Sequence, residues 1–402
     1  MSRVTSLPMA LLCTGAVACG ARDVEPTQQI NAQLVNEKAL DLIPRVEAIV
    51  GLEFKSEPGI EIRTRDQVRA YLIDRLNSQI PPEELDGITR AYRLFGLIPD
   101  TLDLRSFIVS LYTEQVAGYY DPDSTTLYVV SDSDPIELTL VLAHELVHAL
   151  QDQYIPVDSL LSLSRENDRG IAAQAVLEGQ ATLVSIGVML PEQDMSRVPE
   201  FWTQFRDIVR QQQEAMPVLA SAPNVLKETM IFPYLAGADF VRWFMLEYPD
   251  SQPFGIAMPT SSEQILHPER YRSGDAPIRL RVESEENALY SNVLGEFEIR
   301  VLFQELAGDE DIARRAAAGW GGDRFAVFAD GDADALVWWS VWDNEMSARR
   351  FRRTIESEWI ARRGRRVEIL GAAVGGLPAV RVVDAADGWS GWDALPGAER
   401  VQ

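Results

Sequence analysis

The chain has 402 residues, enough for about two domains that each bury a core. Its 46% hydrophobic and 24% charged residues are typical of a globular protein. The formal net charge of -24 argues against binding of nucleic acids or anionic membranes by the body of the protein.

The N-terminus has the pattern of a bacterial export signal. Arg3 supplies a positive charge, and residues 7–17 form an apolar run that is too short to span a membrane. Residues 16–20, Ala-Val-Ala-Cys-Gly, are similar to a lipobox, in which Cys19 becomes the lipidated first residue. Residues 1–19 are therefore predicted to be a signal peptide with a lipobox, with simple secretion as the alternative. Residues 20–39 are predicted to be a polar tether.

The next part of the chain is predicted to be helical and carries no distinctive chemistry. Apolar residues recur at helical spacing in four segments, residues 40–50, 67–78, 89–97 and 104–116. A turn signal, Asp-Pro-Asp at residues 121–123, precedes a β-rich run at 125–130. The helical segments are expected to pack behind the helix that follows this strand.

That helix, within the apolar run 136–150, contains His-Glu-Leu-Val-His at residues 144–148. Residues four apart share a helix face, so His144 and His148 can bind one metal ion. Glu145 lies beside the same ion, where it can take a proton from a water that the ion activates. Two histidines on an otherwise apolar helix would need polar partners if they bound no metal, and the helix offers few.

Zinc in a catalytic site takes three protein ligands, so this motif lacks one. The next candidate is Glu178, within Leu-Glu-Gly-Gln-Ala at residues 177–181. This apolar segment is predicted to be a second helix. The small residues beside Glu178 would allow a close approach to the first helix.

The motif at residues 144–152, His-Glu-Leu-Val-His-Ala-Leu-Gln-Asp, followed by Glu-Gly-Gln-Ala-Thr at 178–182, resembles the gluzincins, the thermolysin-like zinc metallopeptidases. The resemblance implies that His144, His148 and Glu178 are zinc ligands. It also implies that Glu145 is the general base and acid.

The same resemblance implies roles around the metal. Asp152 matches a position that hydrogen-bonds a ligand histidine. Thr182 stands where thermolysin has an aspartate. The strand at 127–130 corresponds to a gluzincin edge strand, with which an extended substrate pairs.

Three later residues are candidate donors to the oxyanion that forms when a carbonyl is attacked. Tyr234 lies in the predicted helical segment 229–247, after a helix at 201–214. His267 is the third histidine of the chain, and Tyr271 follows it by four residues. The sequence leaves the choice among these three open.

Residues 273–277, Ser-Gly-Asp-Ala-Pro, are predicted to be a domain boundary. Beyond it, helices are predicted at 295–306, 311–318 and 345–362, and strands at 324–328, 335–342, 367–370 and 379–383. The expected fold is α+β, mostly α. It has a helical metallopeptidase core with a short edge sheet at 40–275 and a smaller α+β domain at 276–402.

The sequence thus predicts an exported, lipid-anchored, zinc-dependent endopeptidase that acts on peptides or proteins. It would touch the membrane only through a lipid on Cys19. The alternative is an envelope lipoprotein that keeps the fold but cleaves nothing and serves as a binding or assembly module. Hydrolysis of another amide, such as a cell-wall crosslink, is a third possibility, because zinc-activated water can attack any accessible amide.

Overall fold

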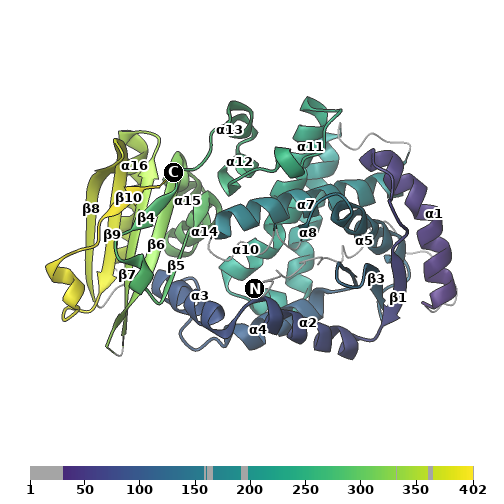
Figure 1. The fold of residues 1–402 in the computed structure, drawn as a ribbon, viewed down its shortest axis with the longest axis horizontal. Helices are drawn as coiled ribbons and strands as arrows, with labels where there is room; N and C mark the ends of the chain where they lie inside the picture. Colours follow the sequence, from purple (N-terminus) through teal and green to yellow (C-terminus); the bar gives the residue numbers. More distant parts are fainter. Residues whose placement is uncertain are drawn as a thin grey trace.

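The fold was analysed in a computed structural model, which describes residues 30–157, 160, 166–191, 198–331, 333–360 and 365–401. It is an α+β fold that is mostly α, as predicted. Helices make up one side of the molecule and the largest sheet stands on the other (Figure 1). The predicted signal peptide and Cys19 lie outside the described residues.

Most of the longer helices coincide with segments for which the sequence predicts a helix. The described α-helices are α1 (Ala32–Val50), α2 (Arg65–Gln79), α3 (Pro82–Phe95), α4 (Leu104–Gln115), α5 (Leu138–Asp152), α7 (Asn167–Met189), α8 (Pro199–Ala215), α9 (Pro217–Ser221), α10 (Asn224–Phe232), α11 (Ala238–Glu247), α12 (Ser262–Leu266), α13 (Pro268–Ser273), α14 (Gly295–Ala307), α15 (Glu310–Ala317) and α16 (Glu345–Trp359). A short π-helix, η2 (Pro233–Gly237), joins α10 to α11.

The described strands form three sheets. The first has the order β1 (Gly59–Arg63), β3 (Thr126–Val130), β2 (Gly118–Asp121), and the second pairs β10 (Ala398–Arg400) with β4 (Leu280–Val282). The largest has the order β5 (Tyr290–Asn292), β6 (Trp320–Asp330), β7 (Ala333–Trp342), β9 (Leu377–Ala385), β8 (Arg366–Val374). Every pairing in this largest sheet is antiparallel.

Helices α5 and α7 form the centre of the helical part, and they pack against each other. Among the described residues, α7 alone is long and apolar enough to cross a membrane, with a mean hydropathy of 1.3 over its best window. However, 89% of that window is buried inside the protein. Burial on all sides explains why α7 is apolar around its whole circumference, as expected for a core helix.

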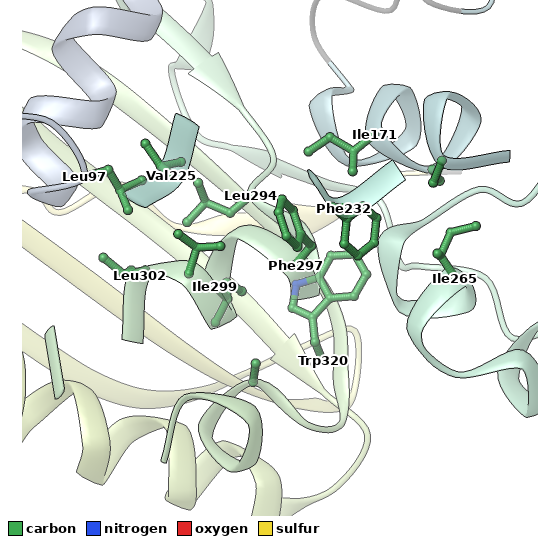
Figure 2. Close-up of a cluster of buried hydrophobic side chains, with 14 of the residues drawn as sticks. Leu97, Ile171, Val225, Phe232, Ile265, Leu294, Phe297, Ile299, Leu302 and Trp320 are labelled. Carbon is green, nitrogen blue, oxygen red and sulfur yellow. The ribbon is translucent and has the colours of Figure 1, made fainter. Parts of the chain in front are cut away.

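One hydrophobic core runs from the helices into the large sheet. Helix α3 packs on this sheet, and the ring of Phe95 makes edge contacts with Phe325, Trp338 and Trp359 at centroid distances of 5.2 to 5.8 Å. Figure 2 shows another part of the same core. The parts of the chain before and after the boundary predicted at residues 273–277 therefore share one hydrophobic core.

The N-terminal region differs from the prediction in two places. Helix α1 begins at Ala32, inside the segment predicted as a tether up to residue 39, and buries five apolar side chains. The parallel strand β1 was not predicted, because its partner β3 lies more than sixty residues later in the chain. Such non-local pairing leaves no signal in the spacing of nearby residues.

Candidate metal centre

Helix α5 carries the two histidines on one face, as their spacing requires. The side chains of His144 and His148 are 8% and 10% exposed, and their Nε2 atoms lie 3.1 Å apart. Two ring nitrogens this close in a buried site share either one proton or one cation. The helix holds them there because most of its other residues are apolar and buried in the core.

Helix α7 brings Glu178 to the same point. Its Oε2 lies 3.1 Å from Nε2 of His144 and 3.5 Å from Nε2 of His148, and the three ligand atoms all lie within 4.8 Å of one another. A tetrahedral ion with ligands at about 2.0 Å would space them by about 3.3 Å. The three side chains therefore fit a small divalent metal ion in both chemistry and spacing.

The charge of Glu178 makes this point attractive to cations. Burial is the largest single influence on the pKa of His148 and lowers it, but the charge and hydrogen bond of Glu178, together with Glu145 and Gln151, raise the pKa to about 9. A metal ion would supply the same compensating positive charge in place of the proton.

Gln151, rather than Asp152, orients His148, one of the candidate ligands. Nδ1 of His148 lies 2.9 Å from Oε1 of Gln151, whose amide nitrogen donates to the carbonyl of Leu177 and to Gln180. Because its amide N–H groups are used in this way, Gln151 faces His148 with its oxygen, which accepts a hydrogen bond from Nδ1–H. Nε2 of His148 is then left to bind a metal. The role expected for Asp152 is thus corrected: its carboxylate accepts a hydrogen bond from the Tyr120 hydroxyl at 3.1 Å.

Glu145 lies between the histidines and strand β2. Its side chain is buried, and its Oε2 has no hydrogen-bond partner among the described residues. The carboxylate also interacts with the backbone N–H of Tyr120. Burial raises the pKa of Glu145. A carboxylate with a raised pKa next to a metal ion suits proton transfer near neutral pH.

The strand beside Glu145 is not the expected one. Strand β3 lies in the middle of its sheet, paired with β1 on one side and β2 on the other. The prediction that residues 127–130 are a free edge strand is therefore wrong. The edge strand next to the site is β2, and a Cβ on its Gly118 would lie 3.5 Å from Cγ of Glu145.

Tyr234 also lies at this site. Its ring centroid is 6.2 Å from that of His144, and both residues line a cavity of about 10 Å³. Tyr234 is in the π-helix η2, which packs against α7 where Gly237 meets Gly179 and the carbonyl of Ala175. Because Gly179 follows Glu178 directly, this close contact fixes the position of Tyr234 relative to the carboxylate of Glu178.

The other two oxyanion candidates make their contacts elsewhere. His267 lies against Glu296 and Arg300 of α14, with Nε2 3.0 Å from the Glu296 carboxylate. Tyr271 donates to the carbonyl of Ala257 at 2.8 Å and packs among aromatic rings of α11. Of the three candidates, the structure brings only Tyr234 together with His144.

The sequence analysis missed Tyr112 of α4. Burial, and after it the negative charge of Glu178, raises the pKa of Tyr112, which places this phenol close to the metal centre. In the sequence, Tyr112 belongs to an ordinary helical pattern. Its closeness to Glu178 follows only from how α4 packs in the folded protein. Thr182, on α7, also lines the small cavity, and its buried hydroxyl has no hydrogen-bond partner in the described part of the chain.

Comparisons with known proteins do not assign the chain to a family. A family model described as "Domain of unknown function (DUF8575)" matches residues 281–391, less than half of the chain. No curated protein matches it. One solved structure that is similar is described as "a putative hydrolase with a novel fold from Chloroflexus aurantiacus"; the match covers 60% of this chain and 89% of that one, with 16% identity and a TM-score of 0.40. At that score the similarity carries no argument, so function is argued from the site itself.

Proposed function

We propose that this protein is a zinc-dependent endopeptidase. The observation that supports it most is the convergence of His144, His148 and Glu178, at mutual distances that suit a tetrahedral ion, with Glu145 buried beside them. Two imidazoles and one carboxylate make a typical catalytic zinc set, which leaves a coordination position open.

The residues around the metal have distinct roles in this proposal. Zinc, when bound, supplies a Lewis acid that polarises a carbonyl and acidifies a water. Beside it, Glu145 would take a proton from the attacking water and deliver it to the leaving amine. Tyr234 donates a hydrogen bond to the oxyanion. Strand β2 is the edge strand that faces Glu145, and because all four of its residues are buried it would align a substrate only when the site opens.

Access of a substrate to the buried site distinguishes the peptidase proposal from the alternative, a binding module that cleaves nothing. The four residues at the centre are all buried, and the cavity beside His144 has room for about one water. A peptide therefore needs a local opening of the helices around the site. A protein that never opens would keep the metal and cleave nothing, which is the binding-module alternative.

Metal analysis with matched variants tests the proposal. Elemental analysis of the full chain supplied with zinc is expected to give about one zinc per chain for wild type and for Glu145→Gln, and none tightly bound for Glu178→Ala. A peptide library should be cleaved by wild type and not by Glu145→Gln, which keeps the metal.

Each other outcome has a distinct meaning. Absence of zinc in wild type would overturn the metal centre. If the protein binds zinc but cleaves neither peptides nor cell-wall amides, the binding-module hypothesis would be favoured. Export and a lipid on Cys19 belong to the same proposal, and labelling with a radioactive fatty acid in wild type and in Cys19→Ala tests them.

A further inference from the structure

A second cavity, of about 410 Å³, lies where the N-terminus of α7 meets strands β4 and β6. Asp168, in the first turn of α7, lines it, and Glu178 follows ten residues later on the same helix. At 1.5 Å per residue, the cavity is about 15 Å from the metal centre along α7. Its size falls in the range of pockets that bind small ligands.

The cavity has a buried acceptor. Asp168 is 3% exposed, and its Oδ1 accepts hydrogen bonds from the backbone N–H and the hydroxyl of Ser262. Its Oδ2 has no partner in the part of the chain that the structure describes, and neighbouring atoms cover it, so a ligand N–H would reach it only after a small local shift. A buried carboxylate oxygen without a donor costs free energy, which a ligand N–H would recover. Burial also raises the pKa of Asp168 to about 7, so that an ammonium group would favour its charged form.

Two arginines in the lining share a single carboxylate. Nη1 of Arg169 and Nη2 of Arg279 each lie 3.3 Å from a different oxygen of Glu166, and their side chains are 40% and 56% exposed. Two positively charged guanidinium groups thus pair with one carboxylate, so this pair of arginines can accept a second anion. A ligand carboxylate would complete the pairing in the forked geometry that arginine prefers.

The remaining wall is largely apolar. Leu280, Val293 and Trp320 contribute to it. Trp320 cannot offer its indole N–H to a ligand, because it donates to Asp323, so its contribution is the apolar ring. Trp320 belongs to the same core cluster as Phe297 and Phe232, part of which Figure 2 shows.

We propose that this cavity binds an apolar amino acid or dipeptide with free termini. The carboxylate would lie between Arg169 and Arg279, the ammonium group would donate to Oδ2 of Asp168, and the apolar side chain would pack on Trp320. The proposal concerns a different site from the metal centre and does not depend on peptidase activity.

Calorimetry on the full chain, with a chelator present to prevent cleavage, tests the site. Leucyl-leucine or leucine is expected to bind. Leucinamide, which lacks the carboxylate, and N-acetyl-leucine, which lacks the ammonium group, should each bind about tenfold more weakly or worse. Arg279→Gln should weaken leucyl-leucine to a similar extent, whereas Arg272→Gln, an exposed arginine that pairs with Glu247, should not.

Asp168→Asn isolates the buried acceptor. Asparagine keeps an oxygen for Ser262, so the fold is retained, and its melting temperature verifies this. Leucyl-leucine should bind this variant about tenfold more weakly, while N-acetyl-leucine should be nearly unaffected. Lack of binding of all four ligands to wild type, or equal binding to wild type, Asp168→Asn and Arg279→Gln, would overturn the proposal. Because the chelator removes the metal, failure here is distinct from failure of the peptidase proposal.

Discussion

At the scale of single residues, the candidate metal centre depends on which side chains face inward from α5. The i, i+4 spacing of His144 and His148 is local, so the sequence predicts their common face. The choice between Gln151 and Asp152 is not local, because it depends on where α7 crosses α5. Gln151 meets the carbonyl of Leu177 and thereby His148, whereas Asp152 turns toward Tyr120.

Gln151→Leu tests the orientation of His148. Without the amide oxygen the ring loses its fixed tautomer, and we expect zinc affinity to fall by about 10- to 100-fold. Competition with a chromophoric chelator measures this. Asp152→Asn is the matched control and should leave affinity unchanged. Equal affinity in wild type and Gln151→Leu would contradict the assigned role.

Tyr234→Phe tests the oxyanion donor. If the phenol stabilises charge that develops in the transition state, the variant should keep its zinc and its KM and lose about 100-fold in kcat. Steady-state peptide cleavage gives both constants. Tyr271→Phe, which removes a hydroxyl bound to the Ala257 carbonyl, is expected to retain wild-type kcat. A loss in Tyr271→Phe as large as that in Tyr234→Phe would rule out the assignment.

At the scale of elements, the site depends on a glycine contact between α7 and η2. A Cβ added to Gly179 would lie 2.3 Å from the carbonyl carbon of Gly237, which is backbone and cannot rotate away. The sequence shows small residues in both segments and so predicts close packing. It does not predict that the chain forms a π-helix at this point, which is frequent at functional sites.

Gly179→Ala should therefore separate α7 from η2. We expect a loss of about 1–3 kcal/mol in the free energy of unfolding and weaker zinc binding. Gly170→Ala, on the same helix and with nothing within 4 Å of the added Cβ, should be neutral or slightly stabilising. Urea unfolding of both variants gives the comparison. Similar stabilities for the two would show that η2 adapts to the extra methyl group.

At the scale of the whole molecule, the sequence predicts the α+β class and most helices, because their apolar periodicity is local. It does not predict that β3 is central, since this requires β1 to cross from a distant part of the chain. Nor does it predict the buried acids between the helices and the large sheet. Burial raises the pKa of Asp168 from 3.8 to about 7 and that of Glu298 from 4.5 to about 8.

These acids predict a pH dependence of stability. A raised pKa means that the folded protein binds more protons than the unfolded chain, so stability falls as pH rises from about 4 through the folded pKa values. The melting temperature of wild type, measured with chelator, should drop between pH 5 and pH 8.5. This fall in melting temperature should be smaller in Glu298→Gln. It should equal that of wild type in Glu305→Gln, because Glu305 is exposed on the same helix. A drop in Glu298→Gln equal to that of wild type would contradict the contribution of Glu298.

The shared interior also limits how this chain can be recombined. Phe95 belongs to α3, which precedes α5 and α7 in the sequence, yet it packs against Trp338 of the sheet that follows them. The sheet formed near the C-terminal end of the chain therefore covers α3, which forms near its start. No single crossover point can exchange the sheet for another module without exposing α3. Homologous chains are consequently expected to inherit α3 and the sheet together, so that the loop at 273–277 tolerates insertions better than replacement of everything beyond it.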